Sequence, residues 1–232
     1  MSDRDLLKRL ERLDTCAISD SMDSFGLVGV VSDITRRSTT SRISGRVQTV
    51  KLSAGKPQKS SKHHLGTRSI EASTSEDIIV VEQRSGIEAA GWGGLLATAA
   101  KAKGIRGVII EGPARDIDEY EELGLPVFSR STTPKTARGR IYESAVNIAI
   151  QVGDINVSPG DFVIADGTGL VFVPHKIAKK VIEKAEQITN HEKLMSKDVI
   201  AGHPVMKVMG SSYENLLETT NLEIVDQPGK NR

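Results

Sequence analysis

Two charged residues, Arg115 and Asp116, stand just past the apolar segment GVIIEG (107–112). A guanidinium presents a fork of N–H donors to a carboxylate or enolate oxygen, and a neighbouring carboxylate can bind a divalent cation. Gly93 and Gly94 lie about one helix plus one strand earlier, at the start of a helical segment. The first turn of a helix has unpaired backbone N–H groups, and glycine lets a ligand approach them. These residues predict an anion-binding turn beside a cation-binding carboxylate.

A strand, a helix and a strand are predicted to position these residues. EDIIVVE (76–82) and GVIIEG (107–112) have the pattern of buried strands, and LLATAAKAKG (95–104) is a helix of strong formers that ends at Gly104. In a strand–helix–strand crossover, the helix begins at the same sheet edge where the second strand ends. The glycine pair should therefore face Arg115 and Asp116 across a cleft. Spacing alone leaves a second interpretation open, in which Asp116 caps its own helix and Arg115 forms a surface pair with it.

The remaining patterns predict an α/β chain with one domain over residues 1–200 and a C-terminal tail over 201–232. We expect the tail to be disordered or packed on a neighbouring subunit. The other expected elements are helices at 4–14, 19–26, 116–124 and 175–195, strands at 43–52, 125–130 and within 141–153, and a hairpin within 161–174 that turns at DGTG.

Composition narrows the function classes. Lysine plus arginine number 31 against 30 acids, and aromatic residues make up 3% of the chain, so neither charge nor stacking surfaces indicate nucleic-acid binding. No apolar run is long enough for a membrane span, and the charged N-terminus does not resemble a signal peptide. The single cysteine, Cys16, excludes an internal disulfide and is expected to be buried as a small apolar residue. We therefore expect a cytoplasmic protein.

Three segments carry a resemblance to a known family: TCAISDSMDSFG near the N-terminus, GWGGLLATAAKAKGIRGVIIEGPARDIDEYEELGLPVFSRSTTP in the centre, and PGDFVIADGTGLVFVP beyond it. Together they resemble the RraA-like family over roughly residues 10–195. That family includes the metal-dependent 4-hydroxy-4-methyl-2-oxoglutarate / 4-carboxy-4-hydroxy-2-oxoadipate aldolases and the RraA regulators of ribonuclease E. The resemblance implies a single α/β/β/α layered domain with a C-terminal helix. It also implies a homo-oligomer, trimer or hexamer, with active sites at subunit boundaries.

The aldolase branch implies roles for the central residues. Arg115 would bind the 2-oxo acid and stabilise the developing enolate, and Asp116 would be the protein ligand of Mg²⁺ or Mn²⁺. The backbone around Gly93, Gly94, Leu95 and Leu96 would receive the substrate carboxylate. The expected protein is a lyase of small 2-oxo acids, which performs retro-aldol cleavage of 4-hydroxy-2-oxo acids or oxaloacetate-type decarboxylation. Both reactions pass through a pyruvate enolate.

The chain departs from the aldolase pattern at one position. That pattern is Asp, twenty residues, Arg-Asp, and Gly94 stands where it has the first Asp, a residue that organises the water on the metal or the proton transfer. Glu119, three residues after Asp116 on the same predicted helix, is our hypothesis for a partial substitute, and a solvated carboxylate is the alternative. Glu192 is a candidate for the carboxylate that the family takes from a neighbouring subunit's C-terminal helix. Glu111 replaces the Asp that the family often has before the motif glycine.

Two other functions fit the same resemblance. One is an RraA-like regulatory protein that binds and inhibits a ribonuclease without catalysis. The other is a decarboxylase or isomerase of a sugar-derived acid on the same site. The intact Arg-Asp pair favours a catalytic site, because a pure binding protein does not need a metal carboxylate there. No histidine has helical spacing to a second ligand, and the basic cluster Lys56, Lys59, Lys62 and Arg68 would either meet a polycarboxylate or be solvated.

Overall fold

The computed structural model describes residues 1–57 and 63–210; Lys59 and Lys62 lie outside this part of the chain. Its helices are α1 (Asp3–Leu10), α2 (Thr15–Ser24), α3 (Thr67–Ala72), α4 (Gly94–Ala102), α5 (Ile117–Leu123), α6 (Ala178–Ile200) and α7 (Val205–Val208), with a 3-10 turn, η1 (His175–Ile177), before α6. Its strands are β1 (Val30–Val31), β2 (Thr35–Arg36), β3 (Ile43–Ala54), β4 (Asp77–Glu82), β5 (Gly107–Ala114), β6 (Val127–Thr132), β7 (Ile141–Val146), β8 (Ile150–Val152), β9 (Ile155–Val157), β10 (Phe162–Ala165) and β11 (Leu170–Val173).

One mixed sheet of nine strands organises the described residues, in the order β1-β11-β10-β3-β4-β5-β6-β2, with β7 paired to β3. Its centre, β3 to β6, is parallel, and the predicted β4–α4–β5 crossover is confirmed by the parallel register that places Ile79 beside Val108. The predicted hairpin is also confirmed: β10 and β11 are antiparallel, and Asp166 N–H donates to the Gly169 carbonyl at 3.0 Å across the turn.

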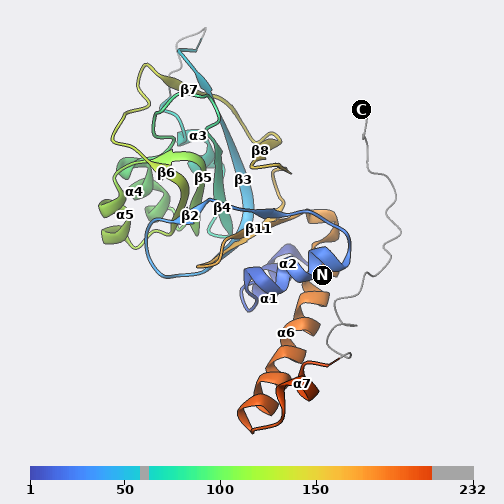
Figure 1. The fold of residues 1–232 in the computed structure, drawn as a ribbon. Coiled ribbons are helices and arrows are strands. Elements are labelled where there is room, and N and C mark those ends of the chain that lie inside the picture. The colour runs from blue at the N-terminus through green and yellow to red at the C-terminus, as the bar shows by residue number, and fades with distance from the viewer. Residues whose placement is uncertain (58–62, 211–232) are drawn as a thin grey trace.

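Alternating side chains of the strands divide the core into three apolar clusters. In β4, Ile79 and Val81 pack under α3, α4 and α5, whereas Ile78 and Val80 face the opposite way. In β10 and β11, residues such as Ile164 pack on α1, α2 and α6. The inward-facing residues of both halves of the sheet meet in the central cluster because the sheet curls on itself. This arrangement is the predicted α/β/β/α layering, with α4 and α5 on one side and α1, α2 and α6 on the other (Figure 1).

The helical layer on β10 and β11 differs from the sequence prediction in two details. Helix α2 begins at Thr15 rather than residue 19, because the Asp14 side chain accepts a hydrogen bond from Ala17 N–H at 2.8 Å and caps the helix. The prediction that Cys16 is buried is wrong: Ala17 and Ile18 point into the core, and Cys16 lies on the outer face of the same turn.

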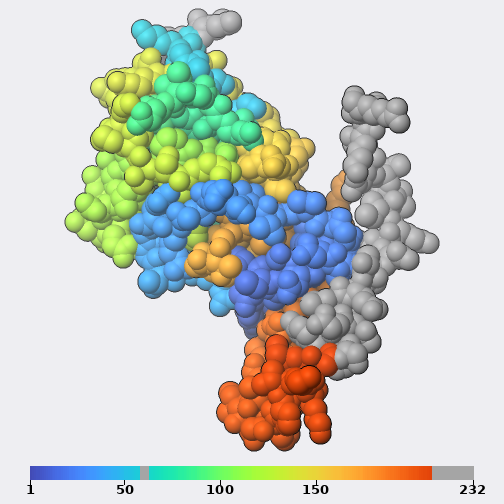
Figure 2. All heavy atoms as spheres, in the orientation of Figure 1, coloured from blue at the N-terminus to red at the C-terminus, as the bar shows by residue number. Residues whose placement is uncertain are grey.

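Helix α6 forms the C-terminal side of the domain. Val181, Ile182 and Ala185 are buried against α1 and α2, and Ile188 on the same side of α6 is buried too, as the periodicity predicts. Beyond them α6 continues to Ile200, and its last turns project with α7 away from the body of the molecule (Figures 1 and 2). None of the helices in residues 1–57 and 63–210 has the length and apolar character needed to cross a membrane.

Candidate active site

Helix α4 and strand β5 bring the glycine pair to the Arg-Asp pair. The N–H of Gly94, the first residue of α4, donates a hydrogen bond to Asp116 Oδ2 at 2.8 Å. The N–H of Arg115 donates to the Trp92 carbonyl at 3.1 Å, so the chain before α4 is tied to the chain after β5. The structure thus places these two segments side by side at one sheet edge.

The Asp116 side chain turns toward α4 rather than its own helix. Asp116 is the residue before α5, but its side chain makes no capping hydrogen bond there, and its backbone is left-handed, with φ 60° and ψ 45°. Aspartate adopts this conformation more readily than most residues. Its Oδ2 also lies 3.2 Å from Arg115 Nε, and the two side chains are 29% and 38% exposed. Both groups therefore remain accessible to a ligand from solvent.

Charged side chains of the protein fill the space where side chains at positions 93 and 94 would lie. A Cβ on Gly93 would lie 2.8 Å from Asp116 Oδ2 and 3.0 Å from Arg115 Nε. A Cβ on Gly94 would lie 1.6 Å from Glu119 Oε2. The glycines thus admit Arg115, Asp116 and Glu119 against the start of α4. The next donors of that turn, the amides of Leu95 and Leu96, have no carbonyl partner within the helix.

A cavity of about 370 Å³ opens beside this turn, a size suited to a small metabolite. It is lined by all five residues expected to bind substrate: Gly93, Gly94, Leu95, Leu96 and Arg115.

The other walls of the cavity include Trp92, His64 and Arg138. Trp92 is 1% exposed, and its Nε1 has no acceptor in the part of the chain that the structure describes. Arg138 forms no ion pair among the described residues. Arg68 of the predicted basic cluster is paired with Glu143 at 2.6 Å and does not line the cavity. The cavity therefore has two cationic side chains for an anionic ligand: Arg138, and Arg115, whose Nε also faces Asp116.

Tyr120 lies beneath the charged residues and is fully buried. Burial raises the pKa of its hydroxyl, and the negative charges of Asp116 and Glu119 raise it further. Tyr120 consequently stays neutral throughout the physiological range and adds no charge to the site.

Asp116 is suited to a hard divalent cation. Among residues 1–57 and 63–210, no group of three or more His, Cys, Asp or Glu side chains could enclose a metal. Mg²⁺ commonly uses only one or two protein carboxylates and completes its shell with water. The second oxygen of Asp116 carries none of the contacts made by Oδ2, and the carboxylate is partly exposed. The donor set therefore fits such an ion.

Glu192 lies on α6 and is separate from Arg115 within one chain. It borders a hollow formed by α6 and α7, and it faces Asp20 of α2. Burial raises the pKa of Asp20, and the charge of Glu192 raises it further. If Glu192 acts at an Arg115 site, that site must belong to another copy of the chain.

Glu111 has a structural position. Its buried carboxylate accepts hydrogen bonds from Arg130 Nε at 2.5 Å and from Gly153 N–H at 2.9 Å. These contacts join β5 to β6 and to the β8–β9 hairpin. Glutamate is therefore used here to position the hairpin, and it does not line the cavity beside Arg115.

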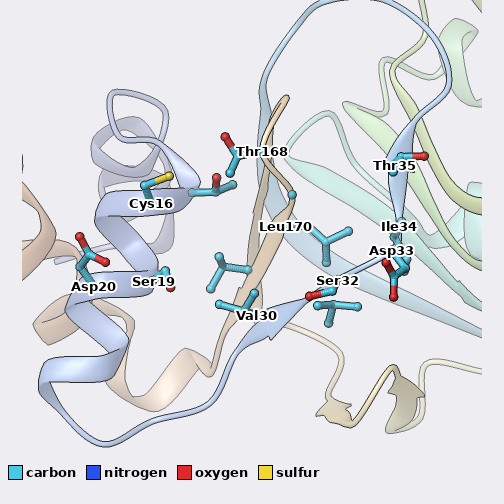
Figure 3. Close-up of a pocket in the computed structure, with 14 residues that line it drawn as sticks. Cys16, Ser19, Asp20, Val30, Ser32, Asp33, Ile34, Thr35, Thr168 and Leu170 are labelled. Carbon is cyan, nitrogen blue, oxygen red and sulfur yellow. The ribbon is translucent and has the colours of Figure 1, made fainter.

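A second cavity, of about 290 Å³, lies between α2, β1 and the β10–β11 turn (Figure 3). Cys16, Asp20 and Asp33 are among its lining residues, and none of those residues is cationic. It offers no cationic side chain to an oxo-acid carboxylate, whereas the cavity at Arg115 combines a guanidinium with the first turn of α4, so we take the cavity at Arg115 as the candidate active site.

Comparisons with known proteins identify the family of this chain. The family model described as "RraA-like: Aldolase/RraA" matches residues 15–172. The 4-hydroxy-4-methyl-2-oxoglutarate aldolase of Thermus thermophilus is 28% identical over 57% of this chain and 76% of its own. A crystal structure of a Pseudomonas syringae protein has a TM-score of 0.80 and 28% identity, and it covers 89% of this chain and 98% of that one.

A longer relative is the protein DlpA of Legionella pneumophila, which is 24% identical over 85% of this chain. The matched region makes up only 32% of DlpA, so this chain spans about a third of the length of that relative.

Proposed function

The chain belongs to the RraA-like family, and on that premise we propose that it is a divalent-metal-dependent carbon–carbon lyase of small 2-oxo acids. The observation that carries the proposal is the meeting of Arg115 and Asp116 with the first turn of α4 at the edge of a cavity. Names of relatives such as the Thermus aldolase support the same chemistry.

Arg115 and the α4 turn would bind the 2-oxo acid. The amides of Leu95 and Leu96 can receive its carboxylate, and the Arg115 guanidinium can donate to its keto oxygen. When the bond beyond C3 breaks, the electron pair moves into an enolate, whose oxygen Arg115 stabilises. A 4-hydroxyl group loses its proton as it becomes a carbonyl, or carbon dioxide leaves instead, and protonation at C3 gives pyruvate.

Mg²⁺ or Mn²⁺, when bound, would supply a Lewis acid for the oxo-acid oxygens. Asp116 would hold it, since Gly94 N–H and Arg115 already fix the direction of this carboxylate. The hydrogen bond from Gly94 keeps the side chain turned toward the start of α4 rather than its own helix.

We also propose a homo-oligomer, trimer or hexamer, that completes the site. Leu95 is 86% exposed beside the cavity, and a large apolar side chain at that place is suited to a subunit contact. Glu192 of a neighbouring copy is the candidate carboxylate that such a contact would bring.

The test is pyruvate release from oxaloacetate and from 4-hydroxy- and 4-carboxy-2-oxo acids, with and without Mg²⁺. Rates are corrected for a protein-free blank, because the metal alone decarboxylates oxaloacetate. We expect metal-dependent release by the wild-type protein and its loss in Asp116→Ala.

Release that does not require metal, or no release from any 2-oxo acid, would contradict the lyase proposal. Turnover of a sugar-derived acid without pyruvate would favour the isomerase or decarboxylase alternative. The regulatory alternative would be favoured if neither protein turned over a substrate and Asp116→Ala inhibited a ribonuclease as strongly as wild type.

A further inference from the structure

Glu119 occupies the space that a side chain at position 94 would fill. A Cβ on Gly94 would lie 1.6 Å from Glu119 Oε2 and 2.5 Å from its Cδ, far inside any real contact. With Glu119 in this conformation, only glycine fits at 94. An aspartate at 94 would project its carboxylate into this same volume, so the two positions are alternative sources of one negative charge.

The start of α4 attracts such a charge. Its first turn contains no acidic residue, and its cap, Gly93, has no side chain to offer. The positive end of the helix dipole is thus met only by carboxylates from the α5 region, Asp116 at the Gly94 amide and Glu119 at the Gly94 Cα.

Glu119 and Asp116 reach that helix start from neighbouring places in the chain, Asp116 just before α5 and Glu119 in the first turn of α5. Asp118 is exposed, as Glu119 is, but it is not among the nearest atoms to a Cβ at Gly93 or Gly94. Two carboxylates with partly open oxygens, close to one helix start, have the number of protein ligands that Mg²⁺ commonly uses.

We propose that Glu119 supplies the carboxylate that position 94 lacks, and that with Asp116 it forms the anionic face receiving the divalent cation and its waters. This inference rests on the proposed lyase function. Glu119 is a positioning residue in this role, because it acts on the substrate through the cation.

The experiment measures Mn²⁺ affinity by the EPR signal of free Mn²⁺, using the full-length protein. We expect Glu119→Gln, which keeps the shape and removes the charge, to weaken Mn²⁺ binding about 10-fold or more. Asp118→Asn is the matched control, since it removes one charge from the same helical turn, and it should bind Mn²⁺ like wild type. Equal affinity of Glu119→Gln and wild type would overturn the proposal and leave Glu119 as a group that only fills space.

A charge-relocation pair gives a second measurement. Glu119→Ala should lose Mn²⁺ affinity, and adding Gly94→Asp to it should restore most of that affinity, because the vacated volume then accepts the aspartate. Gly94→Asp with Glu119 retained should instead lower thermal stability through crowding. A folded double variant that regains no Mn²⁺ affinity would overturn the equivalence of positions 94 and 119. If the double variant does not fold, the Mn²⁺ affinity of Glu119→Gln tests the proposal by itself.

The two proposals fail in different ways. Mn²⁺ binding that depends on Glu119, in a protein that releases no pyruvate, would contradict the lyase reaction and keep the cation site. If pyruvate release depends on metal but Glu119→Gln binds Mn²⁺ as tightly as wild type, the lyase proposal stands and this role of Glu119 is rejected.

Discussion

Single residues explain why two glycines stand at the start of α4. Sequence reasoning assigns them to ligand approach, whereas the structure shows Arg115 and Asp116 against Gly93 and Glu119 against Gly94. The residue types were enough to predict that these groups meet. Which atoms fill the glycine space could not be predicted, because it depends on side-chain conformations and on the left-handed backbone at Asp116.

The first prediction concerns Arg115. Arg115→Lys keeps the charge but removes the planar fork of donors, so a two-point contact with an oxo acid becomes a single one. Losing one charge-assisted hydrogen bond costs about 1.5–3 kcal/mol, which corresponds to about 10- to 150-fold in kcat/KM. Steady-state kinetics of pyruvate release measure this. Arg12→Lys, on the exposed side of the N-terminal segment, is the control, and equal kcat/KM for Arg115→Lys and wild type would show that Arg115 does not bind substrate.

At the scale of elements, long periodic segments were predictable and short strands were not. The crossover β4–α4–β5, the hairpin β10–β11 and the buried side of α6 follow from patterns of several residues. Strands β1 and β2, of two residues each, exist only because β11 and β6 offer them edges to pair with. Cys16 was misplaced because small residues alone do not reveal which side of α2 faces the core.

One contact between elements gives a pH-dependent prediction. Asp166 in the β10–β11 turn accepts hydrogen bonds from Thr15 N–H at 3.0 Å and Thr15 Oγ1 at 2.8 Å, which ties the hairpin to the start of α2. Burial raises the pKa of Asp166, but hydrogen bonds from Thr15, Thr168 and Gly169 outweigh it and the net pKa is lowered. A carboxyl whose pKa is lower in the folded state stabilises the fold above its unfolded pKa, about 3.9, and loses that contribution as the pH falls through the folded pKa.

Asp166→Asn should therefore lower the free energy of unfolding at pH 7. The variant should also lose less stability than wild type as the pH falls below about 4, because the titrating group is gone. Urea unfolding midpoints over a pH series measure both effects, with Asp118→Asn as an exposed control. The same acid slope in wild type and Asp166→Asn would refute the role of this carboxylate.

The whole molecule carries an exposed apolar surface at its C-terminal end. Leu194, Ile200 and Met206 are 60%, 85% and 91% exposed on the segment of α6 and α7 that projects from the body (Figure 2). A projecting segment with such side chains is typical of an interface. It is the part of the described chain best placed to carry Glu192 to a neighbouring copy.

We predict that the double variant Ile200→Asp/Met206→Asp shifts the protein toward smaller species. Two charges in a desolvated contact are costly, so the oligomer should dissociate while the circular dichroism of the domain is unchanged. Sedimentation velocity at several protein concentrations measures the change, and Lys193→Asp is a control at an exposed polar position of α6. A monomeric wild-type protein, or an unchanged oligomer in the double variant, would contradict the prediction.

The central claim is that Arg115, Asp116 and a divalent cation generate an enolate from a 2-oxo acid. Its most direct test is the exchange of pyruvate methyl protons with deuterium oxide, followed by proton NMR, because this exchange requires the enolate and no further substrate group. The proposed site predicts exchange that depends on Mg²⁺, is abolished by EDTA and is lost in Asp116→Ala. No exchange above the protein-free rate, or exchange that persists in Asp116→Ala, would contradict it.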